Sequence, residues 1–228
     1  VSIIPAVLAV VSLAVLARDV PVAGQRAAPK LSLRGLGRPF VLFLLIVGLF
    51  DLGNSSDAFL VLRAQERGLS VAGILGMLIT FNLIYTVIST PAGALSDRIG
   101  RRKIIIGGWV AYALIYLGFG FAQSAWHIWA LYALYGLYYG LAYGTAKALV
   151  ADLVPAALRG TAYGTYNAIL GVLDFPASAI AGVLWQGLGG WQGFGPSAPF
   201  IFGGVLALLA ALLLGLSGIG RTPAARTA

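Results

Sequence analysis

Long apolar runs, separated by short polar segments, follow one another along the chain. The runs lack the strict alternation of barrel strands, and they approach the ~20 residues with which a helix crosses a ~30 Å hydrocarbon core. We therefore expect an all-α, polytopic transmembrane helical bundle of about seven spans. The expected spans are residues 1–17, 39–61, 70–92, 104–122, 128–151, 160–184 and 199–217.

The composition also indicates a membrane protein. Hydrophobic residues make up 60% of the chain and charged residues 10%, against roughly 25% charged residues in soluble domains. The chain has no cysteine, which excludes disulfides, thiolate metal sites and cysteine nucleophiles. Motifs of zinc proteases, serine hydrolases and phosphate-binding loops are missing from the sequence. We therefore expect no enzyme, no cofactor and no metal site.

The net charge of +8 arises from basic residues that gather in alternate inter-span segments. This distribution indicates membrane orientation and argues against a nucleic-acid partner, which would require one basic stripe. Only Arg63 and Arg67 lie on the opposite side, and Lys147 lies within a span. The segments that the positive-inside rule places in the cytoplasm are residues 18–38, 93–103, 152–159 and 218–228.

Two of the cytoplasmic segments carry motifs. The run from Gly93 to Arg102 fits the signature G-x-x-x-D-[RK]-x-G-R-[RK], and the run from Asp152 to Gly160 fits D/E-x-x-P-x-x-x-R-G. The first resembles the loop between the second and third helices of each half of major facilitator superfamily transporters. The second resembles the segment after the fourth helix of a repeat. The resemblance implies a secondary transporter that works by alternating access.

The resemblance also implies a domain arrangement. Residues 39–217 would be the carboxy-terminal bundle, built as three-plus-three helix repeats. A chain that begins at Val1 with an apolar run and no charged leader is typical of a piece of a twelve-helix carrier, whose amino-terminal half would be a partner. The remaining assignments are 1–17 as the last helix of the amino-terminal half, 18–38 as the linker between halves and 218–228 as a cytoplasmic tail.

By resemblance, the first motif forms a conformational latch and the second supplies its partner. We expect Asp152 to pair with one of the arginines, Gly93 to admit a close neighbouring helix, and Asp97 to cap the next helix. The basic run would bind membrane lipid. The alternative is a solvated turn that only orients the chain. The latch residues are Gly93, Asp97, Arg98, Gly100, Arg101 and Arg102, and the latch partners are Asp152 and Arg159.

Four ionisable residues lie within the expected spans, where each costs at least ~2.5 kcal/mol unless it pairs or faces water. With a rise of ~1.5 Å per residue, Asp51 and Asp174 lie at similar depths near the midplane. Asp57 lies nearer the outer surface, where we expect it to pair with Arg63 or water, and Lys147 is close enough to the cytoplasm to snorkel. Each aspartate is a candidate for proton coupling or substrate binding, or else a satisfied structural group.

Polar residues near these aspartates extend the candidate cavity. The run 53–57 forms a poor helix that can unwind, and it contributes Asn54. Asn82 gives the next span a polar face. Tyr139 belongs to a ridge of tyrosines beside a ridge of glycines at 136, 140 and 144, which favours close packing, a substrate-lining face, or both. The cavity residues are Asp51, Asn54, Asp57, Asn82, Tyr139 and Asp174.

Together these features predict a proton-coupled secondary transporter that moves a small molecule out of the cell. The resemblance is to the bacterial efflux branch, of the multidrug or metabolite type, which implies a multi-pass protein of the bacterial inner membrane. The alternative is a transporter-like receptor or scaffold that moves no solute. The mid-membrane carboxylates and Asp97 favour transport.

Overall fold

The computed structural model describes residue 7 and residues 35–220. The chain divides into two compact units, Val1–Lys30 and Leu31–Ala228, and the helices named below belong to the second unit. The expected helix at 1–17, residues 18–34 of the expected linker and residues 221–228 of the expected tail lie outside the described residues.

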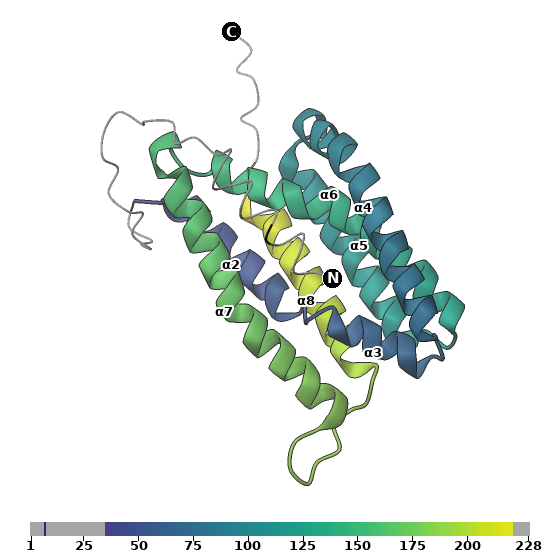
Figure 1. Ribbon diagram of the computed structural model, residues 1–228. Helices are drawn as coiled ribbons and strands as arrows, with labels where there is room; N and C mark the ends of the chain where they lie inside the picture. The colour runs from purple at the N-terminus through teal and green to yellow at the C-terminus, as the bar shows by residue number, and fades with distance from the viewer. Residues whose placement is uncertain (1–6, 8–34, 221–228) are drawn as a thin grey trace. The chain divides into compact units, whose positions relative to one another are not determined.

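Residues 35–220 are α-helical and contain no strand, apart from an isolated bridge between Leu188 and Trp191 (Figure 1). The expected all-α bundle is therefore confirmed for the described residues. The helices are α2 (Arg38–Leu52), α3 (Ala58–Glu66), α4 (Val71–Ile99), α5 (Arg101–Phe121), α6 (Ala125–Asp152), the 3₁₀ helix η1 (Ala156–Leu158), α7 (Arg159–Gln186) and α8 (Ala198–Ser217).

Among the described residues, five stretches are long and apolar enough to cross a membrane. They overlap five of the expected spans. The other expected span among the described residues, 128–151, corresponds to α6, which has 28 residues but is less apolar because it is rich in tyrosine and glycine. The five stretches are Arg38–Glu66, Val71–Ile99, Arg101–Phe121, Ala156–Gln186 and Ala198–Ser217.

Helix α6 packs against both α4 and α5, α5 packs against α8, and α2 packs against α7 and α8. Two glycines let α4 approach α6 closely. A Cβ atom on Gly136 would lie 2.9 Å from the carbonyl oxygen of Phe81, and one on Gly140 would lie 3.0 Å from Cβ of Ile88. The expected close packing is thus present at these two glycines, but a Cβ on Gly144 would meet nothing within 4 Å.

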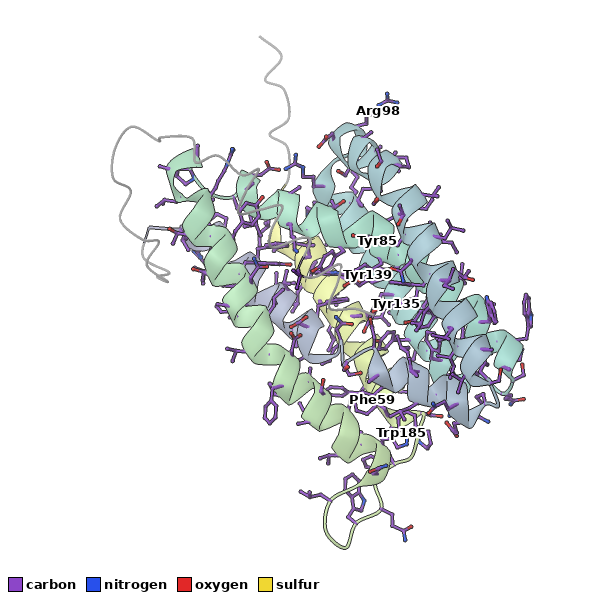
Figure 2. The ribbon with its side chains drawn as sticks, in the orientation of Figure 1. Phe59, Tyr85, Arg98, Tyr135, Tyr139 and Trp185 are labelled. Carbon is purple, nitrogen blue, oxygen red and sulfur yellow. The ribbon has the colours of Figure 1, made fainter. Side chains whose placement is uncertain are left out.

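Tyrosines of α5 and α6 form much of the core. Tyr112 and Tyr116 are fully buried, and their rings stack with centroids 4.0 Å apart. Tyr135 is 1% exposed, whereas Tyr139, one turn along α6, is only partly buried. In Figure 2, Tyr135 and Tyr139 follow one another along α6. The tyrosine ridge therefore extends from the core to an accessible surface.

Arg63 ties α3 to the ends of two other helices. Its side chain is 1% exposed, and its guanidinium donates to the carbonyl oxygens of Phe119 and Gly120 at 3.0 and 2.8 Å. It also donates to Glu66 Oε2 at 2.6 Å and to Ser197 Oγ at 3.3 Å, next to α8. A cation at a helix carboxyl end complements the helix dipole. The expected span ends at residue 61, but α3 continues to Glu66, so Arg63 lies within a helix and not in the segment between spans.

Candidate functional site

The membrane-spanning stretch Arg38–Glu66 is interrupted between α2 and α3. Residues 53–57 leave helical geometry, as the run Gly-Asn-Ser-Ser-Asp predicts, since these residues favour turns and caps over helix interiors. The interruption, called the break below, divides a 29-residue stretch that is otherwise long and apolar enough to span a membrane. Broken helices at membrane depth are tolerated where protein or a cavity satisfies their backbone.

Neighbouring helices satisfy the polar groups of the break. The hydroxyl of Tyr112 on α5 donates to Asn54 Oδ1 at 3.1 Å, and it also approaches the Gly53 carbonyl oxygen at 3.4 Å. The amide of Ser56 donates to Oγ of Ser178 on α7 at 3.2 Å. Tyr135 on α6 donates to Asp57 Oδ1 at 3.2 Å. Of the two partners expected for Asp57, Arg63 or water, Arg63 is not in contact with it in the described structure, and Tyr135 is its partner instead.

A glycine pair holds the start of the break against α8. A Cβ atom on Gly203 would lie within clashing distance of the Gly53 carbonyl oxygen, and one on Gly53 would lie 3.0 Å from Cα of Gly203. Side chains at either position would push α2 and α8 apart. The break therefore contacts α5, α6, α7 and α8 in this conformation.

Asp51 lies in the last turn of α2, immediately before the break. It is 7% exposed, and its Oδ2 atom is buried without a hydrogen-bond partner in the described structure. A Cβ on Gly48, one turn earlier, would lie 3.0 Å from Leu173 Cδ1, so α2 and α7 touch one turn from Asp51. The next residue on α7 is Asp174, which is exposed. The two aspartates therefore lie at the same level of two packed helices.

A cavity of about 580 Å³ opens beside the break. Four of the six expected cavity residues line it: Asn54, Asp57, Tyr139 and Asp174. Asp51 precedes the break but is not among the lining residues. Asn82 does not line the cavity either: it is exposed, and its amide donates to the Leu78 carbonyl of its own helix at 2.8 Å.

Three other lining residues, Ser55, Ser56 and Tyr135, belong to the run 53–57 and to the tyrosine ridge that the sequence indicates. The lining residues from the middle of α7 were not singled out as cavity residues, and only the packing of α7 beside the break selects them. They are Gly171, Phe175 and Ser178.

The first motif is largely helical. Helix α4 runs to Ile99 and α5 begins at Arg101, so the turn consists of Gly100, whose φ of 95° lies in the region that favours glycine. Asp97 therefore belongs to the last turn of α4. The expectation that Asp97 caps the next helix was wrong, because Gly100 is the N-cap of α5. Gly93 has no close neighbour, because a Cβ there would meet nothing within 4 Å.

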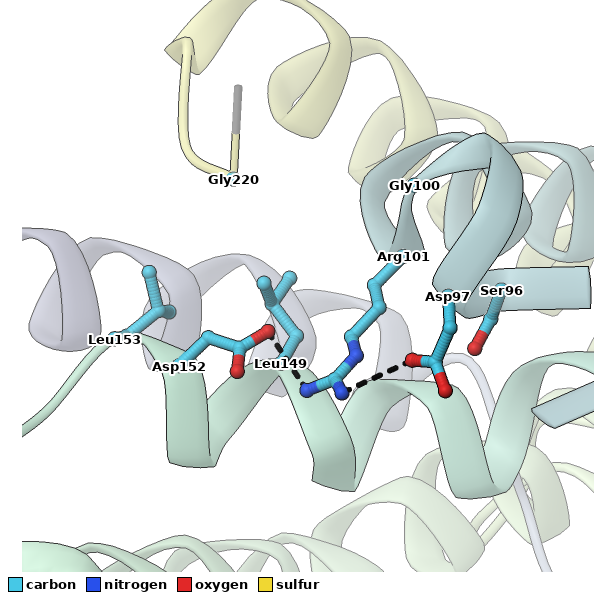
Figure 3. Close-up of a pocket in the computed structure, with 8 residues that line it drawn as sticks. All are labelled: Ser96, Asp97, Gly100, Arg101, Leu149, Asp152, Leu153 and Gly220. Atoms are coloured by element: carbon cyan, nitrogen blue, oxygen red, sulfur yellow. Dashed lines mark hydrogen bonds and ion pairs between the residues drawn. The ribbon is translucent and has the colours of Figure 1, made fainter. Parts of the chain in front are cut away.

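Arg101 joins the two motifs. It donates to Asp152 Oδ2 at 2.7 Å and to Asp97 Oδ1 at 3.1 Å (Figure 3). It also donates to the Ala148 carbonyl oxygen at 2.8 Å. Of the three arginines considered for Asp152, this is the one in contact. The group borders a second cavity of about 470 Å³. We call Asp97, Arg101 and Asp152 the cytoplasmic cluster.

Two further arginines of the motifs cap helix carboxyl ends. Arg102 Nε donates to the Leu214 carbonyl oxygen at 3.3 Å, at the end of α8. Arg159 Nε donates to the Ala151 carbonyl oxygen at 3.2 Å, at the end of α6. Such contacts satisfy free carbonyls and complement the helix dipole. Arg98 instead points away from the bundle at the turn (Figure 2), and Lys103 is exposed. These two are placed to meet lipid or water.

The fold and the two polar regions define a helical membrane protein with a polar cavity beside a broken span. A model of the Major Facilitator Superfamily matches residues 41–227. The chain belongs to this superfamily, whose members are transporters and not enzymes.

Curated relatives agree with this assignment. The uncharacterized MFS-type transporter MJ1317 of Methanocaldococcus jannaschii is 36% identical over 191 residues, which cover 81% of this chain and 46% of that protein. Multidrug resistance protein MdtG of Proteus mirabilis is 33% identical over 133 residues, covering 55% and 32%. MdtG of Salmonella typhi is 32% identical over 114 residues, covering 48% and 28%. The chain spans less than half the length of these relatives.

Proposed function

We propose that this chain forms the carboxy-terminal half of a proton-coupled carrier that exports small molecules across the bacterial inner membrane. The membrane-spanning helices and the transporter family support a carrier, and the name of the MdtG relatives supports efflux of the multidrug type. In this proposal the substrate binds in the cavity beside the break, and an amino-terminal half of the same carrier closes the other side. Residues 39–217 are the bundle, 18–38 the linker between halves and 218–228 the cytoplasmic tail.

The burial of Asp51 is the observation that supports proton coupling. Asp51 is 7% exposed, and its Oδ2 has no hydrogen-bond partner among the residues that the structure describes. A charged carboxylate without a partner is costly in such a site, whereas a protonated one is not. Asp51 therefore takes up a proton in one state of the cycle and releases it when the break opens to water. Asp174, at the same level on α7, is the second candidate for this role.

The cytoplasmic cluster is the proposed latch. Arg101 bridges the end of α4 to the end of α6 through two carboxylates that are 65% and 49% exposed. Pairs this exposed contribute only ~0–1 kcal/mol, so they can break and re-form as the carrier changes conformation. Differential contacts of this size shift a conformational equilibrium without altering the fold.

Reconstitution of the complete carrier in proteoliposomes tests the proposal. An imposed pH difference should drive accumulation of at least one compound from a panel of small molecules. Asp51→Asn should keep substrate exchange and lose accumulation against the gradient. Asp174→Asn tests the second candidate, because it removes the same charge at the same level from an exposed position.

The outcomes separate the proposal from its alternatives. If both variants fold and still accumulate substrate fully, proton coupling does not reside in these aspartates. If the complete carrier moves no compound under any gradient, the chain belongs to a receptor or scaffold that keeps the fold without transport. Lower yield and lower melting temperature of Asp51→Asn would indicate a structural aspartate instead.

A further inference from the structure

The wall of the cavity beside the break is acidic. Its lining residues include the carboxylates of Asp57 and Asp174, and none of the lining residues that the structure describes is lysine, arginine or histidine. Asp51 adds a third carboxylate two residues before the break, with an oxygen that no donor satisfies among the described residues. Opposite charge within a few ångströms stabilises a carboxylate strongly where water is scarce. The missing counter-charge is therefore a positive one.

The same wall presents aromatic faces. Tyr135, Tyr139 and Phe175 line the cavity, and the side chain of Phe175 is 80% exposed. Along α6, the Tyr139 ring stacks on Tyr143 with centroids 4.7 Å apart and planes 17° from parallel. Stacked aromatic rings next to carboxylates are a typical setting for cation–π contact.

An ammonium group already occupies the far end of this aromatic row. Lys147 Nζ lies 4.4 Å from the centroid of the Tyr143 ring, one turn beyond Tyr143 on the same helix. Tyr143 stacks on Tyr139, which lines the cavity. The row therefore binds one cation at its end, and its next ring is available to a second.

We propose that this cavity wall selects organic cations that carry aromatic rings. The inference rests on the proposed function, because it assigns the substrate class of the same cavity. A volume of about 580 Å³ lies within the ~300–1,000 Å³ range of small-molecule pockets. The carboxylates of Asp57 and Asp174 bind the positive charge, and Tyr139 and Phe175 stack on the rings.

Two probes of the same shape and opposite charge test this selection. Tetraphenylphosphonium and tetraphenylborate both carry four phenyl rings, and they differ in the sign of the central charge. Equilibrium binding to the purified complete carrier in nanodiscs, corrected with empty nanodiscs for partition into lipid, should show saturable binding of the phosphonium alone. Tetraphenylborate should not displace it. Equal binding of both ions would overturn the inference.

Substitutions of the lining residues test whether the phosphonium binds at this cavity wall. Asp174→Asn and Asp57→Asn should each weaken phosphonium binding by about tenfold or more, and Asp174→Glu should restore it. Tyr139→Leu should weaken it, whereas Tyr139→Phe should not, because only the ring is required. Glu66→Gln is the matched control, since it removes one carboxylate outside the cavity. Unchanged binding in the aspartate variants, with folding verified by thermal unfolding, would contradict the inference.

Reconstitution of the same complete carrier in proteoliposomes, which enclose a compartment as nanodiscs do not, distinguishes failure of this inference from failure of the proposed function. Gradient-driven movement of anionic or neutral compounds, without phosphonium binding, would overturn the cation selection and leave the carrier intact. Charge-selective phosphonium binding without gradient-driven movement of any compound would support the selection and overturn proton-coupled transport.

Discussion

The cytoplasmic cluster and the break use charge in opposite ways. In the cluster, Arg101 is paired with two carboxylates that remain largely exposed. At the break, Asp51 is almost fully buried and one of its oxygens is unpaired. Exposed pairs are inexpensive to break, whereas a buried unpaired carboxylate is costly to keep charged. The first arrangement suits a contact that changes during a cycle, and the second suits a group that changes its protonation.

Arg63 gives a third case that clarifies the comparison. It is as buried as Asp51, but its guanidinium has partners in Glu66, in Ser197 and in the carboxyl end of α5. Burial with complete pairing indicates a structural role. Burial without pairing, as at Asp51, indicates a functional one. The following variants test this distinction.

The largest effect on stability is expected for Arg63→Met. The substitution leaves the buried carbonyl groups of Phe119 and Gly120 without their donor, and it should lower the free energy of unfolding by roughly 3–5 kcal/mol, as for other broken buried charge contacts. Thermal unfolding of the purified protein measures the change. Arg67→Met is the matched control, because Arg67 is 30% exposed and lies 3.7 Å from Glu66. An equal loss of unfolding free energy in both variants would show that Arg63 has no special structural role.

A large effect on transport, with little effect on stability, is expected for the cytoplasmic cluster. Asp97→Asn or Asp152→Asn removes an exposed partner of Arg101 and should reduce transport by the complete carrier by up to about fivefold, with less than ~1 kcal/mol lost in unfolding. Initial transport rates and melting curves measure both quantities. Arg98→Gln, on the same turn but pointing away from the bundle, should transport normally. Normal transport in both aspartate variants would reduce the cluster to an orientation signal.

A small effect on stability is expected for Asp51→Asn. Asparagine keeps the size of the side chain and removes the charge that has no partner, so the free energy of unfolding should change by less than ~1 kcal/mol. Melting curves beside those of Arg63→Met provide the comparison. A loss as large as that of Arg63→Met would show that the Asp51 carboxylate holds the fold together.

No change in stability is expected for surface cysteines that report orientation. The chain has no native cysteine, and Arg98 and Gln123 are exposed at opposite ends of α5. In intact cells, an impermeant thiol reagent should label Gln123→Cys and should label Arg98→Cys only after the membrane is opened. Labelling of both from outside would overturn the proposed cytoplasmic position of the first motif.

The two regions also differ in how far the sequence reveals them. The residues of the first motif are contiguous, so the sequence reveals them as a pattern. The pattern did not decide which of three arginines pairs with Asp152. The structure selects Arg101 and assigns Arg102 and Arg159 to helix ends. The break was visible as a run of poor helix formers. Its partners Tyr112, Tyr135 and Ser178 were not, because they lie on other helices.

Sequence alone determined that this chain is an all-α membrane protein, where five of its spans lie and which family it resembles. These properties follow from hydrophobicity and from short motifs, which are local along the chain. Tertiary structure decided that Arg63 is buried, that Asp57 contacts Tyr135, and that Asn82 stays outside the cavity. These facts depend on how each helix is rotated and which neighbour it meets, and packing between distant segments sets that rotation.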